Sequence, residues 1–141
     1  MARKIRFSRL GTCHHVMLRG NGGQDIFLDD VDRVRFCLLL QAASEKYGFS
    51  VHAFCFMSNH IHLILEPTER LLQEGVHSFS FRYAQYFNRR YQRKGYVYQG
   101  RFRSICIEEG IYFKRVVRYI HLNPVRAKLV DDPLHYLWSS H

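Results

Sequence analysis

The stretch FSVHAFCFMSNHIHLILE, residues 49–66, decides the fold because it contains two expected strands joined by a very short link. Residues 49–57 and 60–66 are rich in aromatic and branched apolar side chains, which favour strands. The link, Ser58-Asn59, has the length of the shortest hairpin loops. We therefore expect the two strands to pair as a hairpin, or as a bulged and nearly continuous ladder.

Further helices and strands are predicted on either side of this pair. The expected elements are a strand over 13–20, a helix over 31–47 capped by Asp29 or Asp30, a helix over 69–92 weakened near Gly75, a strand over 97–108, and a helix over 111–122 ended by Pro124. The order β-α-β-β-α-β-α is typical of an α+β, ferredoxin-like (RRM-like) fold. Such a fold has an antiparallel four-stranded sheet with helices on one face, here followed by a C-terminal helix. Because no linker or repeat interrupts the chain, we expect a single domain over residues 1–141.

The chain is strongly basic, with 21 Lys and Arg residues against 12 Asp and Glu residues and a formal net charge of +9. Such an excess attracts polyanions and indicates a nucleic-acid partner, although ribosomal and membrane-surface proteins share it. A hydrophobic content of 47% excludes a disordered chain. No apolar run approaches the roughly 18–20 residues of a membrane span, and no secretory segment is evident. We therefore expect a cytoplasmic protein, associated with the nucleoid through DNA.

The triplet His60-Ile61-His62 is the most informative local pattern. In a strand, residues i and i+2 point to the same face, about 6.5–7 Å apart at Cα, so the two imidazoles emerge side by side. The side chain between them, Ile61, then points into the core. Neutral imidazoles in this arrangement suit a metal ion, but two hydrogen-bonded surface histidines would give the same pattern.

Tyr119 and Asn123 lie one turn apart on the last expected helix, beside its apolar stripe. Both side chains are therefore expected at the rim of the buried face, where a nucleophile and a metal ligand need to be. An ordinary amphipathic tyrosine, followed by an Asn cap before a proline, is the alternative. No spacing singles out His14, His15 or His52, and the four cysteines include no C-x-x-C pair.

Four motifs, taken together and in this order, resemble the single-tyrosine HUH transposases, and within them the REP-associated tyrosine transposases. The motifs are MSNHIHLI at 57–64, YAQYFNRR at 83–90, YQGRF at 98–102 and YIHLNPVRA at 119–127. The N-terminal His15-Val16 with Arg19-Gly20-Asn21, and the ending Trp138-Ser139-Ser140, also fit. The resemblance covers nearly the whole chain.

The resemblance implies a role for each of the residues singled out above. His60 and His62 match the two histidines of the HUH motif, Tyr119 matches the nucleophile, and Asn123 matches the polar residue that completes the protein's share of the metal site. The mixed imidazole and amide ligands favour Mg²⁺ or Mn²⁺, and ligand type alone leaves zinc open. The implied activity is cleavage and rejoining of single-stranded DNA at hairpin-associated sites through a 5′-phosphotyrosine, generally by a homodimer.

Basic residues spread along the chain are expected to contact the DNA backbone. They are Arg82, Arg89 and Arg90 on the long helix, Arg101 and Arg103 on the last strand, and Arg19 and Asn21 in the N-terminal motif, with Arg6 and Arg9 as an N-terminal arm. Phe87, Tyr91 and Tyr96 are candidates for stacking on unpaired bases. A solvated basic face and core aromatics are the alternatives for these residues.

Three other functions remain compatible with these patterns. The same sheet order serves non-catalytic single-stranded nucleic-acid-binding modules. Another HUH endonuclease, a replication initiator or a relaxase, would share the two histidines. A metal-dependent hydrolase would cleave without a covalent intermediate, which distinguishes it from transfer by Tyr119.

Overall fold

The computed structural model describes residues 9–108 and 110–141, so Arg6 lies outside the described residues. Its main elements are β1 (His14–Arg19), α1 (Asp30–Tyr47), β2 (Phe49–Phe56), β3 (His60–Pro67), α2 (Leu72–Arg90), β4 (Arg103–Cys106) and α3 (Ile111–Arg126). Short 3-10 turns follow β1 and α3, at Asn21–Gly23 and Pro133–His135. The predicted order of strands and helices is confirmed.

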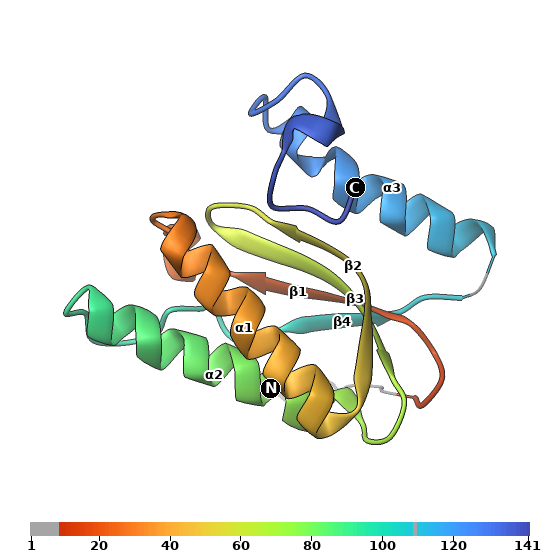
Figure 1. The fold of residues 1–141 in the computed structure, drawn as a ribbon, viewed down its shortest axis with the longest axis horizontal. Coiled ribbons are helices and arrows are strands. Elements are labelled where there is room, and N and C mark those ends of the chain that lie inside the picture. The colour runs from red at the N-terminus through yellow and green to blue at the C-terminus, as the bar shows by residue number, and fades with distance from the viewer. Residues whose placement is uncertain (1–8, 109) are drawn as a thin grey trace.

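The four strands form one antiparallel sheet in the order β2-β3-β1-β4, which is the ferredoxin-like arrangement. Helices α1 and α2 cover one face of this sheet, and α3 lies across the other (Figure 1). The two central strands are β3 and β1, and their register places His62 opposite Met17 and His60 opposite Arg19. Among the described residues, no helix is both long and apolar enough to span a membrane.

The two faces of the sheet have separate apolar clusters. Beneath α1 and α2 lies the larger one, which includes Ile61, Leu63 and Leu65 of β3. Beneath α3 lies a smaller one, which includes Ile64 and Ile120. The alternation predicted for β3 is confirmed, since Ile61 is fully buried on the face opposite to that of the histidines.

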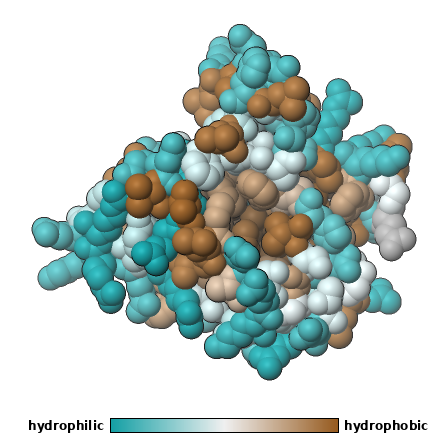
Figure 2. Space-filling model, viewed as in Figure 1, coloured by the Kyte–Doolittle hydropathy of each residue, from teal (hydrophilic) through white to brown (hydrophobic). Residues whose placement is uncertain are grey.

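Helix α1 begins and ends as the sequence predicts. The Asp29 carboxylate accepts a hydrogen bond from the Asp32 backbone N–H, and Gly48 ends the helix in the left-handed conformation at φ 70°. Its outer surface is nevertheless partly apolar, because Val31, Val34 and Leu38 are exposed. Figure 2 shows apolar side chains over the region where α1 lies.

Three details of the predicted elements are wrong. Gly75 does not interrupt α2: it is buried inside the continuous helix, where a Cβ would lie 2.8 Å from the Phe49 ring. Pro124 does not end α3, which continues to Arg126 because packing of the helix outweighs one lost hydrogen bond. The strand expected over 97–108 is regular only at Arg103–Cys106, because Gly100 has a positive φ of 67° that interrupts the extended backbone.

The C-terminal segment lies against the outer edge of β2. The backbone N–H of Phe56 donates to the Trp138 carbonyl, and the N–H of Ser140 donates to the Phe54 carbonyl. The Trp138 indole also donates to Asp30 at the start of α1, at 3.0 Å. These contacts cover an edge that the sheet would otherwise expose.

Candidate active site

The predicted histidine pair lies on the face of the sheet that α3 covers. The ring centroids of His60 and His62 are 5.0 Å apart, and the rings are nearly perpendicular, at 89°. His62 is only 5% exposed, whereas His60 is partly buried. Since strand geometry alone aligns the two side chains, no distortion of β3 is needed to bring them together.

Both imidazoles are held in the neutral form. Burial, together with the neighbouring His15 and His60, lowers the pKa of His62 to about 3. The pKa of His60 is lowered by burial and by the Arg19 charge, and a hydrogen bond to Asn123 opposes this. A neutral imidazole keeps a nitrogen lone pair, so both side chains have the form that binds a metal ion.

Tyr119 reaches the histidines from α3 of the same chain. Its ring centroid is 5.8 Å from that of His62, and its side chain is 43% exposed. Helix α3 is anchored here by Ile120, which is fully buried in the apolar cluster beneath the helix. The neighbouring Tyr119 therefore lies at the rim of the buried face, as its position on the helix predicts.

Asn123 lies one turn further along α3 and joins the same group. Its side-chain amide donates to the Tyr119 carbonyl at 3.2 Å, and its side chain also hydrogen-bonds to His60. The structure thus brings together four residues that the sequence singled out: His60, His62, Tyr119 and Asn123.

His15 is a member of this group that the sequence analysis missed. Its Nε2 lies 3.0 Å from Nδ1 of His62, and its side chain is only 8% exposed. The contact is diagonal across two strands, because His15 pairs directly with Ile64, two residues beyond His62. No spacing rule connects residues 47 positions apart, so only the strand register could reveal it.

Arg126 is a second residue that the sequence analysis missed. Its guanidinium carbon lies 4.8 Å from the centroid of the Tyr119 ring. Residues seven apart lie on the same side of a helix, so this contact could have been predicted had α3 been extended past Pro124. A cation over an aromatic ring is attracted to its π-face and restricts how the ring moves.

Among the described residues predicted to bind DNA, two lie beside the histidines. Arg19 pairs with His60 across the sheet, and Arg103 pairs with Met17, which itself pairs with His62. Both arginines are exposed on the face that carries His60 and His62. They are therefore placed to meet an anion that approaches this face.

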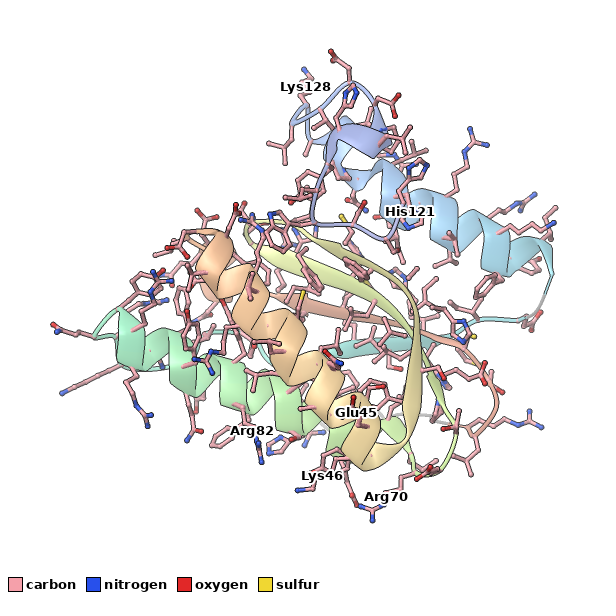
Figure 3. The ribbon with its side chains drawn as sticks, viewed as in Figure 1. Glu45, Lys46, Arg70, Arg82, His121 and Lys128 are labelled. Carbon is pink, nitrogen blue, oxygen red and sulfur yellow. The ribbon has the colours of Figure 1, made fainter. Side chains whose placement is uncertain are left out.

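Several other predicted DNA contacts lie on other parts of the surface. Arg82 and Arg89 are exposed on α2, which covers the opposite face of the sheet, and Figure 3 shows Arg82 well away from His121 of α3. Arg101 and the 85% exposed Tyr96 line a groove of about 630 Å³ between α2 and the segment 95–102. Asn21 is exposed in the turn after β1.

Arg90 does not fit the predicted phosphate contact, because acidic residues of this chain already bind it. Its guanidinium contacts both Asp29 and the fully buried Asp32, each at 2.7 Å. Among the predicted stacking residues, Phe87 is wrong because it is buried in the core. Tyr91 is half-buried: its ring packs against Phe87, and its hydroxyl donates to Asp32. The aromatic surface of Phe87 is therefore not available to a base.

Comparisons with known proteins agree with this arrangement. The family model described as "Transposase IS200 like" matches residues 11–123. The solved structure of a REP-associated tyrosine transposase bound to a REP hairpin superposes with a TM-score of 0.82 at 17% identity, covering 99% of this chain and 82% of that one. A candidate transposase from Deinococcus radiodurans R1 superposes with a TM-score of 0.57 at 14% identity, covering 85% of this chain and 94% of that one. A search of curated proteins found no match.

The identity to both solved structures is low, so their likeness establishes the fold: an α+β protein with an antiparallel four-stranded sheet and a C-terminal helix. The family model supplies the stronger statement, because it spans most of the chain and nearly all of the elements that build the site. The chain belongs to the IS200-like transposase family.

Proposed function

We propose that this protein is a DNA transposase that cleaves and rejoins single-stranded DNA, with Tyr119 as the nucleophile. The observation that carries the proposal is the position of the Tyr119 ring, 5.8 Å from the ring of His62 and on the same chain. Family membership supports a role in DNA strand transfer, and the basic surface supports a nucleic-acid substrate.

The residues present fit a divalent metal ion. His60 and His62 offer neutral imidazoles whose rings lie 5.0 Å apart, and the Asn123 amide oxygen can supply a third ligand. We infer Mg²⁺ or Mn²⁺, because these ions accept a mixed nitrogen and oxygen site that stays open to phosphate and water. When bound, such an ion neutralises a non-bridging phosphate oxygen and polarises the phosphorus atom.

His15 has a positioning role in this proposal. When Nδ1–H of His62 donates to Nε2 of His15, the lone pair of His62 is left on Nε2, the nitrogen farther from β1. The opposite tautomer would place a hydrogen on that nitrogen and prevent binding. In this proposal His62 donates to His15, and the contact orients His62 so that its Nε2 lone pair can hold the ion.

In the proposed reaction, Oη of Tyr119 forms a bond to phosphorus while the bond from phosphorus to the 3′ oxygen breaks. The phenolic proton leaves through the exposed side of the tyrosine, and the departing 3′ oxygen takes up a proton. Arg126 over the ring holds the side chain in place and adds positive charge beside the phosphate. The 5′-phosphotyrosine retains the bond energy, so another 3′-OH can rejoin the strand.

We further propose that a hairpin-bearing single strand crosses the α3 face of the sheet. Arg19 and Arg103 would contact its phosphates near the histidines, while Arg101 and Tyr96 would bind a more distant part. The tyrosine and the histidines come from one chain, so a homodimer, which we keep as a prediction, is not needed to complete the site.

The decisive experiment incubates the protein with 5′- and 3′-labelled single-stranded hairpins in Mn²⁺ or EDTA and analyses denaturing gels. We expect a covalent adduct that needs Mn²⁺ and disappears in Tyr119→Phe, while DNA binding persists. Tyr112→Phe is the matched control, because Tyr112 is an exposed tyrosine on the same helix, seven residues before Tyr119. Cleavage without an adduct would instead indicate a hydrolase, and binding alone would indicate a non-catalytic module.

A further inference from the structure

A second group of metal-binding side chains lies on the α3 face, at the opposite end of β3 from His60. Cys13 Sγ lies 3.6 Å from Oε1 of Glu66, and Nε2 of His52 lies 3.1 Å from the same oxygen. All three ligand atoms lie within 4.8 Å of one another. Sequence spacing gave no reason to connect these residues, because they come from three separate segments.

The sheet itself brings the three residues together. Cys13 comes just before His14, which pairs with Leu65, so the continuing register places Cys13 beside Glu66. His52 is the extra residue of a β-bulge, because Val51 pairs with Leu65 while Ala53 pairs with the adjacent Ile64. Bulges redirect a side chain, and this one allows the His52 imidazole to reach across to β3.

The distances suit one shared cation. In a tetrahedral site with bonds of about 2.0–2.3 Å, neighbouring ligand atoms lie roughly 3.3–3.7 Å apart. The contacts of Cys13 and His52 with Glu66, at 3.6 Å and 3.1 Å, are close to this range, and the third pair of ligand atoms lies within 4.8 Å, so side-chain rotations alone would bring the three onto one ion. His52 and Glu66 are 37% and 29% exposed, which leaves an entry path and a fourth position for water.

We propose that Cys13, His52 and Glu66 bind one Zn²⁺-type cation. A thiolate, an imidazole and a carboxylate form a set that zinc prefers, whereas Mg²⁺ selects oxygen ligands. The thiolate and the carboxylate together supply the two negative charges that neutralise the ion, and the thiol proton is released to solvent on binding. Such a set differs from the neutral ligands His60, His62 and Asn123.

The two proposed sites are separate, but residues of both contact the same helix, α3. Glu66 is four positions along the strand from His62, or about 13 Å, too far for one ion to serve both. The His52 ring contacts the edge of Phe113, with centroids 6.1 Å apart, in the first turn of α3. A cation on His52 would therefore fix the beginning of the helix whose later turn carries Tyr119.

The test uses the full chain, freed of metal with a chelator and then titrated with Zn²⁺ by calorimetry and with Co²⁺ by absorption spectroscopy. To remove the other site, the background carries His60→Ala and His62→Ala. We expect one Zn²⁺ per chain, a cobalt–thiolate absorption band, and a rise in melting temperature on adding Zn²⁺. Cys13→Ser should remove the band and weaken Zn²⁺ binding at least tenfold.

Cys106→Ser is the matched control, because Cys106 is exposed and lies outside the group, and it should leave both signals unchanged. If Cys13→Ser does not fold, His52→Gln tests the same site through an exposed ligand, again with an expected tenfold loss. The proposal is overturned by a band that survives in Cys13→Ser, by Zn²⁺ binding that His52→Gln does not weaken, or by no Zn²⁺ binding in the background protein. None of these outcomes depends on whether Tyr119 cleaves DNA.

Discussion

The two faces of the sheet use the same strand for different purposes. On the face beneath α1 and α2, β3 contributes Ile61, Leu63 and Leu65 to a continuous core. On the face beneath α3, the same strand contributes His60, His62, Ile64 and Glu66. Of these four residues, Ile64 belongs to the smaller apolar cluster. Because side chains alternate between the two faces, core residues and residues of the candidate site alternate along β3. Substitutions at neighbouring positions should therefore affect different properties, stability on one face and activity on the other.

The arginines on the two sides of the sheet also have different surroundings. On the α1 and α2 side, Arg90 is bound by Asp29 and Asp32, and the hydroxyls of Tyr86 and Tyr91 also donate to Asp32. On the α3 side, Arg19 and Arg103 are exposed beside the histidines, and neither forms an ion pair with an acidic side chain among the described residues. The first group satisfies a buried carboxylate, and the second attracts an anion from outside.

The largest effect is expected from adjacent substitutions in β3. His62→Ala should lower adduct formation with single-stranded DNA by about 100-fold or more, since a metal ligand matters at least as much as its supporting residues. Leu63→Ala should instead cost about 2–5 kcal/mol of stability, because Leu63 is fully buried. Adduct assays and urea unfolding of both variants test this pair. Equal loss of stability in both would contradict the separation of the two faces.

His15→Phe should weaken metal-dependent cleavage by about 10- to 100-fold, because it removes the partner of His62 while keeping a ring of similar size. The measurement is cleavage rate against Mn²⁺ concentration. Added Mn²⁺ should restore much of the rate if His15 acts through the metal site. A matched control is His135→Phe, because His135 is exposed in the short turn Pro133–His135 and lines neither the site nor the groove. A normal Mn²⁺ dependence in His15→Phe would exclude the positioning role.

Arg90→Met should lower stability without lowering DNA affinity, because it leaves the buried Asp32 carboxylate without its cation. Unfolding in urea gives the stability, and fluorescence anisotropy with labelled single strands gives the affinity. Arg89→Met, the neighbouring exposed arginine, is the control and should unfold like the unsubstituted protein. If Arg90→Met has normal stability but binds DNA weakly, that result would support the phosphate contact that the sequence predicts for Arg90.

Low pH should lower the stability of the protein by protonating Asp32, on the α1 and α2 side of the sheet. Burial raises the pKa of this carboxyl, but hydrogen bonds from the Leu28 N–H, Tyr91 and Arg90 outweigh it and hold the pKa below the ordinary value of 3.8. Because the pKa of Asp32 is lower in the folded protein than in the unfolded chain, its ionised carboxylate stabilises the fold at pH values above the unfolded-state pKa. This contribution is lost as the pH falls through the folded-state pKa. Melting temperatures between pH 5 and pH 2 should therefore fall more steeply for the unsubstituted protein than for Asp32→Asn. Parallel curves would show that other groups set the acid limit.

The smallest effects are expected from single surface arginines. Arg19→Ala and Arg103→Ala should each reduce the slope of log affinity against log salt by about one, because each removes one phosphate contact. Arg82→Ala should change the slope less, because Arg82 lies on α2 beyond the opposite face (Figure 3). Anisotropy titrations at several salt concentrations give the slopes. A larger change for Arg82→Ala would place the DNA on the α2 side.

Much of the fold was predictable because its determinants are local. The alternation in β3, the Asp29 cap, the Gly48 stop and the order of elements follow from backbone geometry within a few residues. The boundaries that failed depend on distant packing. Gly75 stays helical because Phe49 packs against it, and α3 continues past Pro124 because its buried side chains hold it on the sheet.

The sequence by itself determined the candidate ligands His60 and His62, because one strand fixes their relative direction, and the one-turn spacing of Tyr119 and Asn123, because one helix fixes it. Only the tertiary structure decided which residues join them. His15 meets His62 through strand register, Arg90 is bound by carboxylates on another helix, and Cys13 meets Glu66 across the sheet. Local backbone geometry repeats along the chain and can be predicted from it, whereas contacts between distant segments depend on how the whole core packs.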